Sequence, residues 1–375
     1  MDILILGGTG AIGNHLIATL AKAGHNIDVT SRKKHENEES IRYFQGDAHD
    51  VEFIKDILRN KHYAAIFDFM IYTTSEFRER YRMFLDNTEQ YFFLSTSRVY
   101  ADVAIIQETT PRLLDTVNDI EYLNTDEYAI AKARQENILN QSERRNYTII
   151  RPYITYSRYR LQLGVLDKDT FVQRALNGQS IVVPRDIMQH TTTLTYGADV
   201  ASCMARLIGN SKAMGNTFHI TTNKAIKWMD VLEIYISAFE KKKGFRPKVK
   251  IISHCPQLYT ETERYQVIYD RLYDRCFDNS KIMEAIGGFE FTDSRKGLAS
   301  CMDAFLETPQ FSGLDSRSEG IHDHYSREYT SLAKFPTIKQ KIRYLLYRTA
   351  PIIIARSVLF IKHLRREFRK KGGRQ

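Results

Sequence analysis

The 375-residue chain has only four cysteines, and they lie far apart with no Cys-x-x-Cys pair. This spacing excludes a zinc ribbon and a disulfide framework, and it favours a reducing cytoplasm. No apolar run reaches the roughly 18 residues that a membrane-spanning helix needs. The first expected strand begins at residue 2, so we expect no signal peptide. With 43% hydrophobic and 26% charged residues and no internal repeat, the composition predicts a globular protein of one large or two ordinary domains.

Acidic residues are scarce at the C-terminal end of the chain, where basic residues are frequent. Residues 334–375 contain 13 Lys and Arg but a single acid, Glu367, whereas the whole chain has 54 basic and 45 acidic residues. Residues 1–333 therefore hold 41 basic and 44 acidic residues, which is a net charge of −3. The +9 of the chain comes from an appendage, and we expect no nucleic-acid partner for the body.

The most informative segment is the first 34 residues. The apolar run Asp2–Leu6 has strand length, a glycine-rich turn follows it, a segment of helical periodicity ends at Gly24, and Ile27–Thr30 has the character of a second strand. This order predicts a nucleotide-binding βαβ unit. Its glycines would allow a tight turn, close approach of a pyrophosphate and close helix packing, with phosphates at the helix N-terminus. The expected cofactor contacts in the turn are Gly7, Thr9, Gly10, Ile12 and Gly13.

Basic residues follow the second strand of this unit. NAD-specific sites usually carry an acid here, which binds the ribose 2′-hydroxyl. This chain has Ser31, Arg32 and Lys33 instead, and such cations can pair with a 2′-phosphate. We therefore predict that NADP(H) is the favoured cofactor and that Arg32 contacts it, while NAD(H) stays open. A solvated loop of charges would fit the same residues.

Three further segments follow in a recognisable order. Ser-Thr-Ser at 95–97 follows an apolar strand, Tyr128 and Lys132 form a Tyr-x-x-x-Lys motif, and Arg151-Pro152 follows another strand. Together with the Gly-x-x-Gly-x-x-Gly turn, these segments resemble the extended short-chain dehydrogenase/reductase superfamily, the epimerase/dehydratase family that modifies nucleotide sugars. The resemblance covers about residues 1–306. It implies an α/β fold with a Rossmann-type doubly wound parallel sheet and a smaller mixed α/β substrate domain.

The resemblance also implies catalytic roles. Tyr128 would exchange a proton with the substrate, Lys132 would also hold the nicotinamide ribose, and Thr96 would hydrogen-bond the reacting oxygen, with Ser95 or Ser97 as alternatives. Tyr128 and Lys132 are four residues apart and therefore share one face of a helix. A neighbouring ammonium lowers the pKa of a phenol from its ordinary value of about 10, which suits it for proton transfer.

Other positions receive weaker roles from the same resemblance. Asp47 and Ala48 match residues that lie beside the adenine. Arg271 and Arg275 are the candidates for contacting the diphosphate of a substrate, although a surface salt bridge fits each of them equally well.

His322-Asp323-His324 has the spacing of two metal ligands on a strand, but no other ligand cluster supports it. We therefore predict no metal site.

The expected domains are not contiguous in sequence. Residues 1–156 and about 187–225 form the NAD(P)-binding Rossmann domain, and about 157–186 and 226–311 form the substrate domain. A Ser-, Gly- and charge-rich stretch at 312–333 is expected to be a linker. Residues 334–375 are expected to form a helical, basic, amphipathic tail.

The expected reaction is hydride transfer at a carbon of a nucleotide-diphosphate sugar, C4 being favoured. A 4-keto reductase is slightly favoured, because Arg32 and Lys33 suggest NADPH, and a 4-epimerase with bound NAD is the alternative. A 4,6-dehydratase is less favoured, since relatives with that activity carry Asp-Glu directly after the catalytic Thr, where this chain has Ser97-Arg98. A non-catalytic nucleotide-binding relative is the remaining class.

The basic tail permits two placements. Helical spacing over 337–348 and 351–369 gives an apolar surface surrounded by Lys and Arg, which suits a helix at an anionic bilayer. A helix docked on the body or on a partner subunit fits equally well. The expected location is therefore the cytoplasm, with peripheral contact to the inner face of the membrane left open. A homodimer, frequent in the extended family, is left open too.

Overall fold

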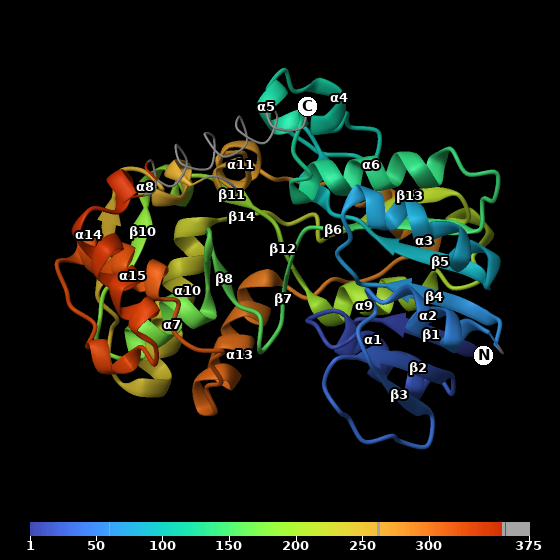
Figure 1. The fold of residues 1–375 in the computed structure, drawn as a ribbon, viewed down its shortest axis with the longest axis horizontal. Helices are drawn as coiled ribbons and strands as arrows, with labels where there is room; N and C mark the ends of the chain where they lie inside the picture. Colours follow the sequence, from blue (N-terminus) through green and yellow to red (C-terminus); the bar gives the residue numbers. More distant parts are fainter. Residues whose placement is uncertain (60, 261–262, 355–356, 358–375) are drawn as a thin grey trace, which may run out of the picture. The chain divides into compact units, whose positions relative to one another are not determined.

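The computed structural model describes residues 1–59, 61–260, 263–354 and 357, and its chain divides into two compact units (Figure 1). Unit 1 comprises Met1–Ser157, Thr192–Ile226 and Arg275–Gly297. Unit 2 comprises Arg158–Thr191, Lys227–Asp274 and Leu298–Gln375.

Unit 1 is built on a sheet of seven parallel strands. Their spatial order is β13 (Asn216–Ile220), β6 (Tyr147–Pro152), β5 (Thr88–Leu94), β4 (Tyr63–Asp68), β1 (Asp2–Leu6), β2 (Asn26–Ser31) and β3 (Ile41–Gln45). The chain begins inside the sheet, adds strands toward one edge, and then returns past β1 to add the others. This is the doubly wound order, and it confirms the predicted Rossmann-type fold.

Helices cover both faces of this sheet because the strands are apolar on both sides. Ile3 and Ile5 of β1 belong to a core that includes side chains of α1 (Gly13–Lys22) and α9 (Gly197–Arg206). Leu4 and Leu6 belong to the opposite core, with α2 (Val51–Leu58), α3 (Thr74–Asp86) and α6 (Tyr128–Asn140). Figure 1 shows α3 and α6 on one side of the sheet and α1 and α9 on the other.

Short elements complete unit 1. They are η1 (Ser97–Val99), α4 (Leu113–Thr116), α5 (Ile120–Leu123), η2 (Ser211–Ala213), α12 (Ser280–Ile286) and the parallel pair β7 (Ile154–Tyr156) and β12 (Leu194–Tyr196). The segment Arg275–Gly297, which was predicted in the substrate domain, belongs to unit 1 in the structure. Its backbone pairs with Ile106, whose N–H donates to the Cys276 carbonyl over 2.8 Å, and Ile282 packs in the α1 and α9 core.

Unit 2 contains a short parallel sheet among helices. The elements that lie within it are β8 (Gln162–Leu163), β9 (Leu166–Asp167), α7 (Lys168–Leu176), β10 (Ile181–Pro184), α8 (Arg185–Met188), α10 (Trp228–Lys243), β15 (Val249–Ile252), η3 (Pro256–Tyr259), α11 (Glu263–Gln266), the π-helical η4 (Val267–Arg271), α14 (Ser316–Ser326), η5 (Leu332–Lys334) and α15 (Ile338–Thr349). Strands β10 and β15 pair in parallel. Three elements cross the unit boundaries: β11 (Thr191–Thr192), β14 (Ile226–Lys227) and α13 (Ser294–Glu307). Trp228 begins α10 and is buried.

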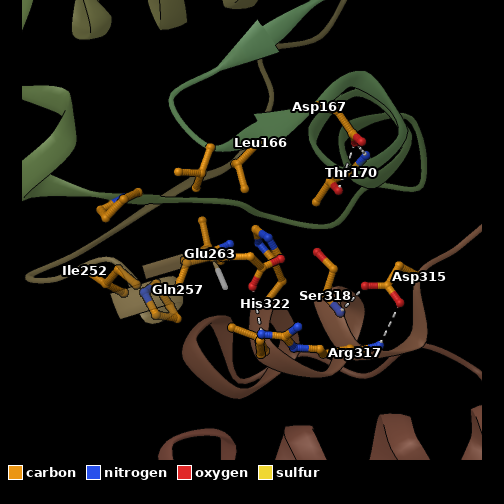
Figure 2. A pocket seen from close by; sticks show the side chains of 15 residues that line it. Leu166, Asp167, Thr170, Ile252, Gln257, Glu263, Asp315, Arg317, Ser318 and His322 are labelled. Carbon is orange, nitrogen blue, oxygen red and sulfur yellow. Dashed lines mark hydrogen bonds and ion pairs between the residues drawn. The ribbon is translucent and has the colours of Figure 1, made fainter. Parts of the chain in front are cut away.

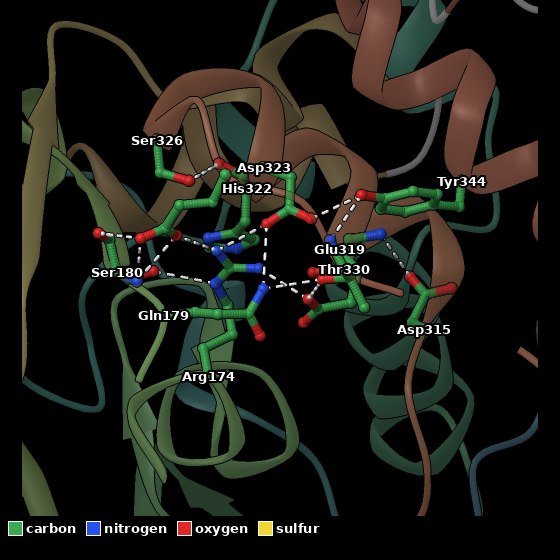
Figure 3. A network of polar contacts seen from close by, with 12 residues as sticks. Arg174, Gln179, Ser180, Asp315, Glu319, His322, Asp323, Ser326, Thr330 and Tyr344 are labelled. Carbon is green, nitrogen blue, oxygen red and sulfur yellow. Dashed lines mark hydrogen bonds and ion pairs between the residues drawn. The ribbon is translucent and has the colours of Figure 1, made fainter. Parts of the chain in front are cut away.

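The prediction of a linker at 312–333 does not hold for Ser316–Ser326, because these residues form helix α14. The cause is the buried guanidinium of Arg174 on α7, which lies 2.7 Å from Glu319 Oε2 and 2.9 Å from Asp323 Oδ1 (Figure 3). Glu328 lies 3.0 Å from the same guanidinium and also accepts from the Ser180 amide. Polar residues that are typical of a loop therefore form the anchor of a packed helix.

The basic tail is described only in part. The first predicted helical segment is α15, which is packed against α14, whereas most of the second, at 351–369, lies outside the described residues. In the described ranges, no helix combines the length and the apolar character needed to cross a membrane. Nor do three or more His, Cys, Asp or Glu side chains of those ranges cluster as metal ligands.

Candidate active site

The glycine turn joins the carboxyl end of β1 to helix α1. Gly7 has a φ of +69°, and its amide donates to Thr30 Oγ1 on β2 over 3.0 Å. A Cβ on Gly13 would lie 2.1 Å from the Gly8 carbonyl oxygen, so α1 can pack here only without a side chain. A Cβ on Gly10 would have no neighbour within 4 Å. The turn is thus tight at Gly13 and open at Gly10, which fits a pyrophosphate approaching the backbone at Gly10.

This difference between two glycines gives a paired prediction. Gly10→Ala should leave the thermal stability of the chain unchanged, because the new methyl group enters open space, but it should weaken dinucleotide binding about tenfold or more. Gly13→Ala should destabilise the fold itself, since its methyl group meets backbone. Dinucleotide titration by fluorescence and thermal unfolding of both variants measure the two effects. Unchanged binding in Gly10→Ala would contradict a cofactor at this turn.

The other predicted cofactor residues in the turn lie at its end. Ile12 is the N-cap of α1, and the Thr9 carbonyl accepts from Asn14 Nδ2 over 3.3 Å. The hydrogen bond from Asn14 uses the backbone carbonyl of Thr9 and not its side chain. Helix α1 therefore begins three residues after Gly10, and the cofactor contacts of this turn stay predictions.

Arg32, Asp47 and Ala48 follow neighbouring strands at the same edge of the sheet. Arg32 is exposed directly after β2, and Asp47 is exposed after β3, where it accepts from the His49 amide over 3.0 Å. Ala48 is buried. Since β1, β2 and β3 are parallel neighbours, these residues and the glycine turn share the carboxyl edge where α/β folds bind ligands.

Thr96 is the N-cap of η1, directly after β5, and its Oγ1 accepts from the Arg98 amide over 3.2 Å. The two alternative hydroxyls are used inside the protein. Ser95 Oγ donates to Glu136 Oε1 over 2.5 Å, and Ser97 Oγ donates to the Arg151 carbonyl over 2.8 Å. Of the three candidates, Thr96 is therefore the one best placed to reach a ligand.

Tyr128 is the first residue of α6, and Lys132 lies one turn further on. The Lys132 side chain is 1% exposed, with Nζ 3.2 Å from the Met70 carbonyl oxygen and 4.4 Å from the centre of the Phe93 ring. Burial lowers the pKa of Lys132 to about 8, while the carboxylates of Asp68 and Glu136 oppose that shift. The amine is therefore still mostly an ammonium at neutral pH.

Met70 connects Lys132 to the glycine turn. Its carbonyl accepts from the lysine, and its Sδ lies where a Cβ on Gly7 would be only 2.8 Å away. Asp68 fixes this segment, because it accepts from the Met70 amide over 2.9 Å and from the Tyr91 hydroxyl over 2.7 Å. Asp68 is therefore a local hydrogen-bonding residue.

A buried ion cluster supports the inner side of α6. Arg151 Nε and Nη2 lie 2.8 and 2.6 Å from the two oxygens of Glu136, which also accepts from Ser95. Arg112 adds a contact of 3.2 Å to the same carboxylate. Glu136 lies four residues after Lys132 and was missed in the sequence, where only its helical spacing could have indicated an inward position.

Arg98 and Glu127 were also missed. Arg98 Nη2 lies 2.6 Å from Glu127 Oε1, and the guanidinium lies 5.5 Å from the centre of the Tyr128 ring. Glu127 is in addition the N-cap of α6, accepting from the Ala129 amide over 2.8 Å. Both flanks of Tyr128 are thus fixed, and its ring has a cation beside it.

The two arginines predicted to contact a diphosphate are both buried, so neither is a surface salt bridge. Arg271 lies in unit 2, where it pairs with Asp270 and donates from Nε to the Gly164 carbonyl over 3.1 Å. Arg275 lies in unit 1, where Nη1 contacts the carbonyls of Tyr100 and Ala101 at 3.2 Å each. Their role toward a diphosphate stays a prediction.

A cavity of about 180 Å³ lies within unit 2, between the β9–α7 segment and α14 (Figure 2). None of the predicted site residues is among those that line it. Its carboxylates already have partners: Asp167 and Asp315 cap α7 and α14, and Glu263 lies 2.8 Å from Arg317. The cavity therefore shares no lining residue with the predicted site of unit 1.

His322 lines this cavity, and its buried imidazole should make the stability of the fold sensitive to acid. Burial and the Arg174 cation lower the pKa of the imidazole from 6.5 to about 3. Since the unfolded chain binds this proton first, its contribution to stability is complete above pH 6.5 and falls as the pH falls toward 3. The free energy of unfolding should drop by about 2 kcal/mol between pH 7.5 and pH 5. Urea unfolding at the two pH values measures this drop. The variant His322→Leu has no imidazole and should lack the His322 contribution to the pH dependence of the free energy of unfolding. Equal pH dependence in the parent and the variant would contradict this assignment.

Comparison with known proteins gives a family and a shared fold. The family model described as "RmlD substrate binding domain" matches residues 1–306. A chloroplast stem-loop binding protein of 41 kDa from Arabidopsis thaliana is 26% identical over 270 residues, which are 68% of this chain and 66% of that protein, just under two thirds of its length.

Two solved structures share the fold at low identity. The dTDP-glucose 4,6-dehydratase of Bacillus anthracis, in complex with NAD, is 15% identical with a TM-score of 0.62, covering 82% of this chain and 97% of its own. The UDP-glucuronic acid 4-epimerase of Bacillus cereus, also with NAD, is 14% identical with a TM-score of 0.60, covering 81% and 96%. Because the family model matches residues 1–306, the chain belongs to the RmlD substrate binding domain family of the extended short-chain dehydrogenase/reductase superfamily. The order of the strands and the helix that carries Tyr128 and Lys132 agree with this assignment.

Proposed function

We propose that this protein is an NAD(P)-dependent enzyme that transfers a hydride at a carbon of a nucleotide-diphosphate sugar, with reduction of a 4-keto sugar as the favoured reaction. The observation that carries the proposal is the buried ammonium of Lys132. It lies one helical turn from Tyr128, and it is bonded to Met70, which packs against Gly7 of the dinucleotide turn. One cation thereby connects the proton-transfer group to the cofactor turn.

The side chains divide the chemistry among them. The nicotinamide, when bound, supplies or accepts the hydride. Tyr128 gives its proton to the sugar carbonyl oxygen during reduction, and Lys132 favours the phenolate that results. Thr96 donates a hydrogen bond to the same oxygen and so orients it toward Tyr128. The Arg98 cation beside the Tyr128 ring further stabilises negative charge on the phenolate.

The choice among reactions depends on this chain's own residues, since the two solved structures named above carry different reactions on one fold. Positions 97 and 98, directly after Thr96, hold no acid. Arg98 is engaged with Glu127, so the second acid and base that a dehydration needs are not supplied there. Arg32, exposed after β2, supports a cofactor with a 2′-phosphate and therefore a reductase that consumes NADPH.

The test uses the purified full chain with a panel of nucleotide sugars and their 4-keto forms. Absorbance at the reduced-nicotinamide band is followed with NADPH and, separately, with NADH. Consumption of NADPH with a keto sugar is the expected result. Interconversion of two sugars without net consumption would make the enzyme a 4-epimerase with bound NAD, and no reaction with any member would remove the proposal.

Arg32 offers a direct test of cofactor choice. Arg32→Glu should shift the preference from NADP(H) toward NAD(H) by about tenfold or more, because a carboxylate repels the 2′-phosphate and can bind the free ribose hydroxyl. Lys34→Glu, an equal charge change in the same exposed loop, is the control and should leave the preference unchanged. Equal shifts in both variants would mean that only the net charge of the loop matters.

A non-catalytic nucleic-acid role is the second candidate. It is favoured by the name of the Arabidopsis relative, a stem-loop binding protein, and by the basic tail, and it is opposed by the net charge of −3 over residues 1–333. Binding of an RNA stem-loop at 0.15 M salt (a concentration at which weak non-specific contacts are largely screened), together with no turnover of any nucleotide sugar, would favour this role.

A further inference from the structure

Helix α15 is fixed to unit 2 by one of its faces. Tyr344 and Tyr347 are buried on that face, and the Tyr344 hydroxyl donates to Asp323 Oδ2 over 2.8 Å and accepts from the Thr330 amide over 2.8 Å. A Cβ on Gly320 of α14 would lie 2.6 Å from the Tyr344 carbonyl, so the two helices touch at backbone distance. The orientation of α15 on unit 2 is therefore determined by packing and by buried hydrogen bonds.

The opposite face of α15 is apolar and open. Four large aliphatic residues on it are exposed to a degree that is unusual for such side chains: Ile338 by 74%, Ile342 by 53%, Leu345 by 39% and Leu346 by 44%. At 3.6 residues per turn, all four lie within about 100° of the helix circumference, directly opposite Tyr344 and Tyr347. These four residues form an apolar stripe that stays exposed among the residues that the structure describes, on a helix that is already anchored.

Basic residues border the stripe. Lys341 lies on one flank, and Lys339 and Arg343 lie on the other, while α15 itself contains no acid. Over residues 334–375 the sequence carries 13 basic residues and one acid. The helix thus combines an apolar face with cationic flanks, which suits an anionic surface that has an apolar interior.

We propose that α15 binds unit 2 to an anionic lipid bilayer, with the helix lying in the plane of the surface and its four aliphatic residues among the acyl chains. RNA fits less well, because both aromatic rings of α15 are buried and cannot stack on bases. The anchored tyrosine face distinguishes this surface from a flexible basic tail, which would bind through charge alone. The proposal is independent of the catalytic reaction.

The test is co-sedimentation of the full chain with vesicles of phosphatidylglycerol and phosphatidylcholine, compared with vesicles of phosphatidylcholine alone, at 0.15 M salt. We expect binding to the anionic vesicles only, weakened by added salt. The double variant Ile342→Glu plus Leu346→Glu should bind the anionic vesicles about tenfold or more weakly, because it puts two carboxylates into the stripe. The control is Ile105→Glu plus Ile251→Glu, which changes two aliphatic residues that are 62% and 42% exposed elsewhere, and it should bind as the parent does.

Thermal unfolding and nucleotide-sugar turnover of both double variants check that the fold is retained. Failure of the parent chain to sediment with anionic vesicles would overturn the proposal. So would equal binding by the stripe variant and the control. Sedimentation velocity without lipid gives one more outcome. If the parent chain does not bind vesicles but forms a dimer, and the stripe variant is a monomer, then the stripe is an interface with a second copy of the chain, and the lipid proposal is wrong.

Discussion

Tyr128→Phe should lower turnover of the nucleotide sugar by about 10²- to 10⁴-fold while leaving dinucleotide binding unchanged. The variant removes only the hydroxyl that exchanges the proton. The ring that lies 5.5 Å from the Arg98 guanidinium is retained, as is the N-cap at Glu127, so α6 should keep its position. Steady-state kinetics with the best substrate of the panel, and fluorescence titration with NADPH, measure the two quantities.

A matched control is Tyr159→Phe, which removes an exposed phenol in unit 2 and should leave both quantities as they are. Turnover by Tyr128→Phe at the parent rate would eliminate the proposed proton donor. A loss of NADPH binding together with turnover would indicate instead that the hydroxyl shapes the cofactor site. The two results are distinct, so the experiment separates chemistry from binding.

Arg174→Met should reduce the stability of unit 2 by about 3–5 kcal/mol, because it leaves the carboxylates of Glu319 and Asp323 without their cation in the interior. Both carboxylates are buried, and burial already raises the pKa of Glu319 despite the neighbouring arginine. The loss should be larger at pH 8 than at pH 5, since protonation of a carboxylate relieves part of the penalty.

The chain provides its own probe for this measurement. Trp228 is the single tryptophan, is buried, and lies in unit 2, so its fluorescence in urea reports the unfolding of that unit. Arg246→Met serves as the control, because Arg246 pairs with Glu233 and Glu240 on the surface and should contribute little that can be measured. A loss below about 1 kcal/mol in Arg174→Met would mean that the buried carboxylates find other partners or take up protons.

The parts of the fold that sequence reasoning predicted are those with local causes. The glycine turn needs a positive φ at Gly7 and no side chain at Gly13, and both needs arise within one βαβ unit. Strands β1, β4 and β5 are apolar on both faces, which follows from their place inside a parallel sheet. Thr96, Tyr128 and Lys132 were predicted because they occur in segments that resemble the motifs of the extended family, and their roles stay predictions.

The parts that were missed depend on residues far apart in the chain. The burial of α14 follows from Arg174, more than 140 positions earlier, and no local pattern in 312–333 reveals that partner. Whether Ser95, Thr96 or Ser97 faces a ligand is decided by Glu136 and Arg151, which occupy the two serines. Arg275 belongs to unit 1 because the backbone after it pairs with Ile106. Such pairings become visible only in three dimensions.

The ion pair between Arg98 and Glu127 couples residue 98 to the first turn of helix α6. An acid at position 98, as in relatives that dehydrate, would face the carboxylate of Glu127 and repel it. That repulsion would disturb the N-cap of α6 and therefore the position of Tyr128. An acid at residue 98 would therefore need a change at Glu127 as well, so the contact couples these two positions.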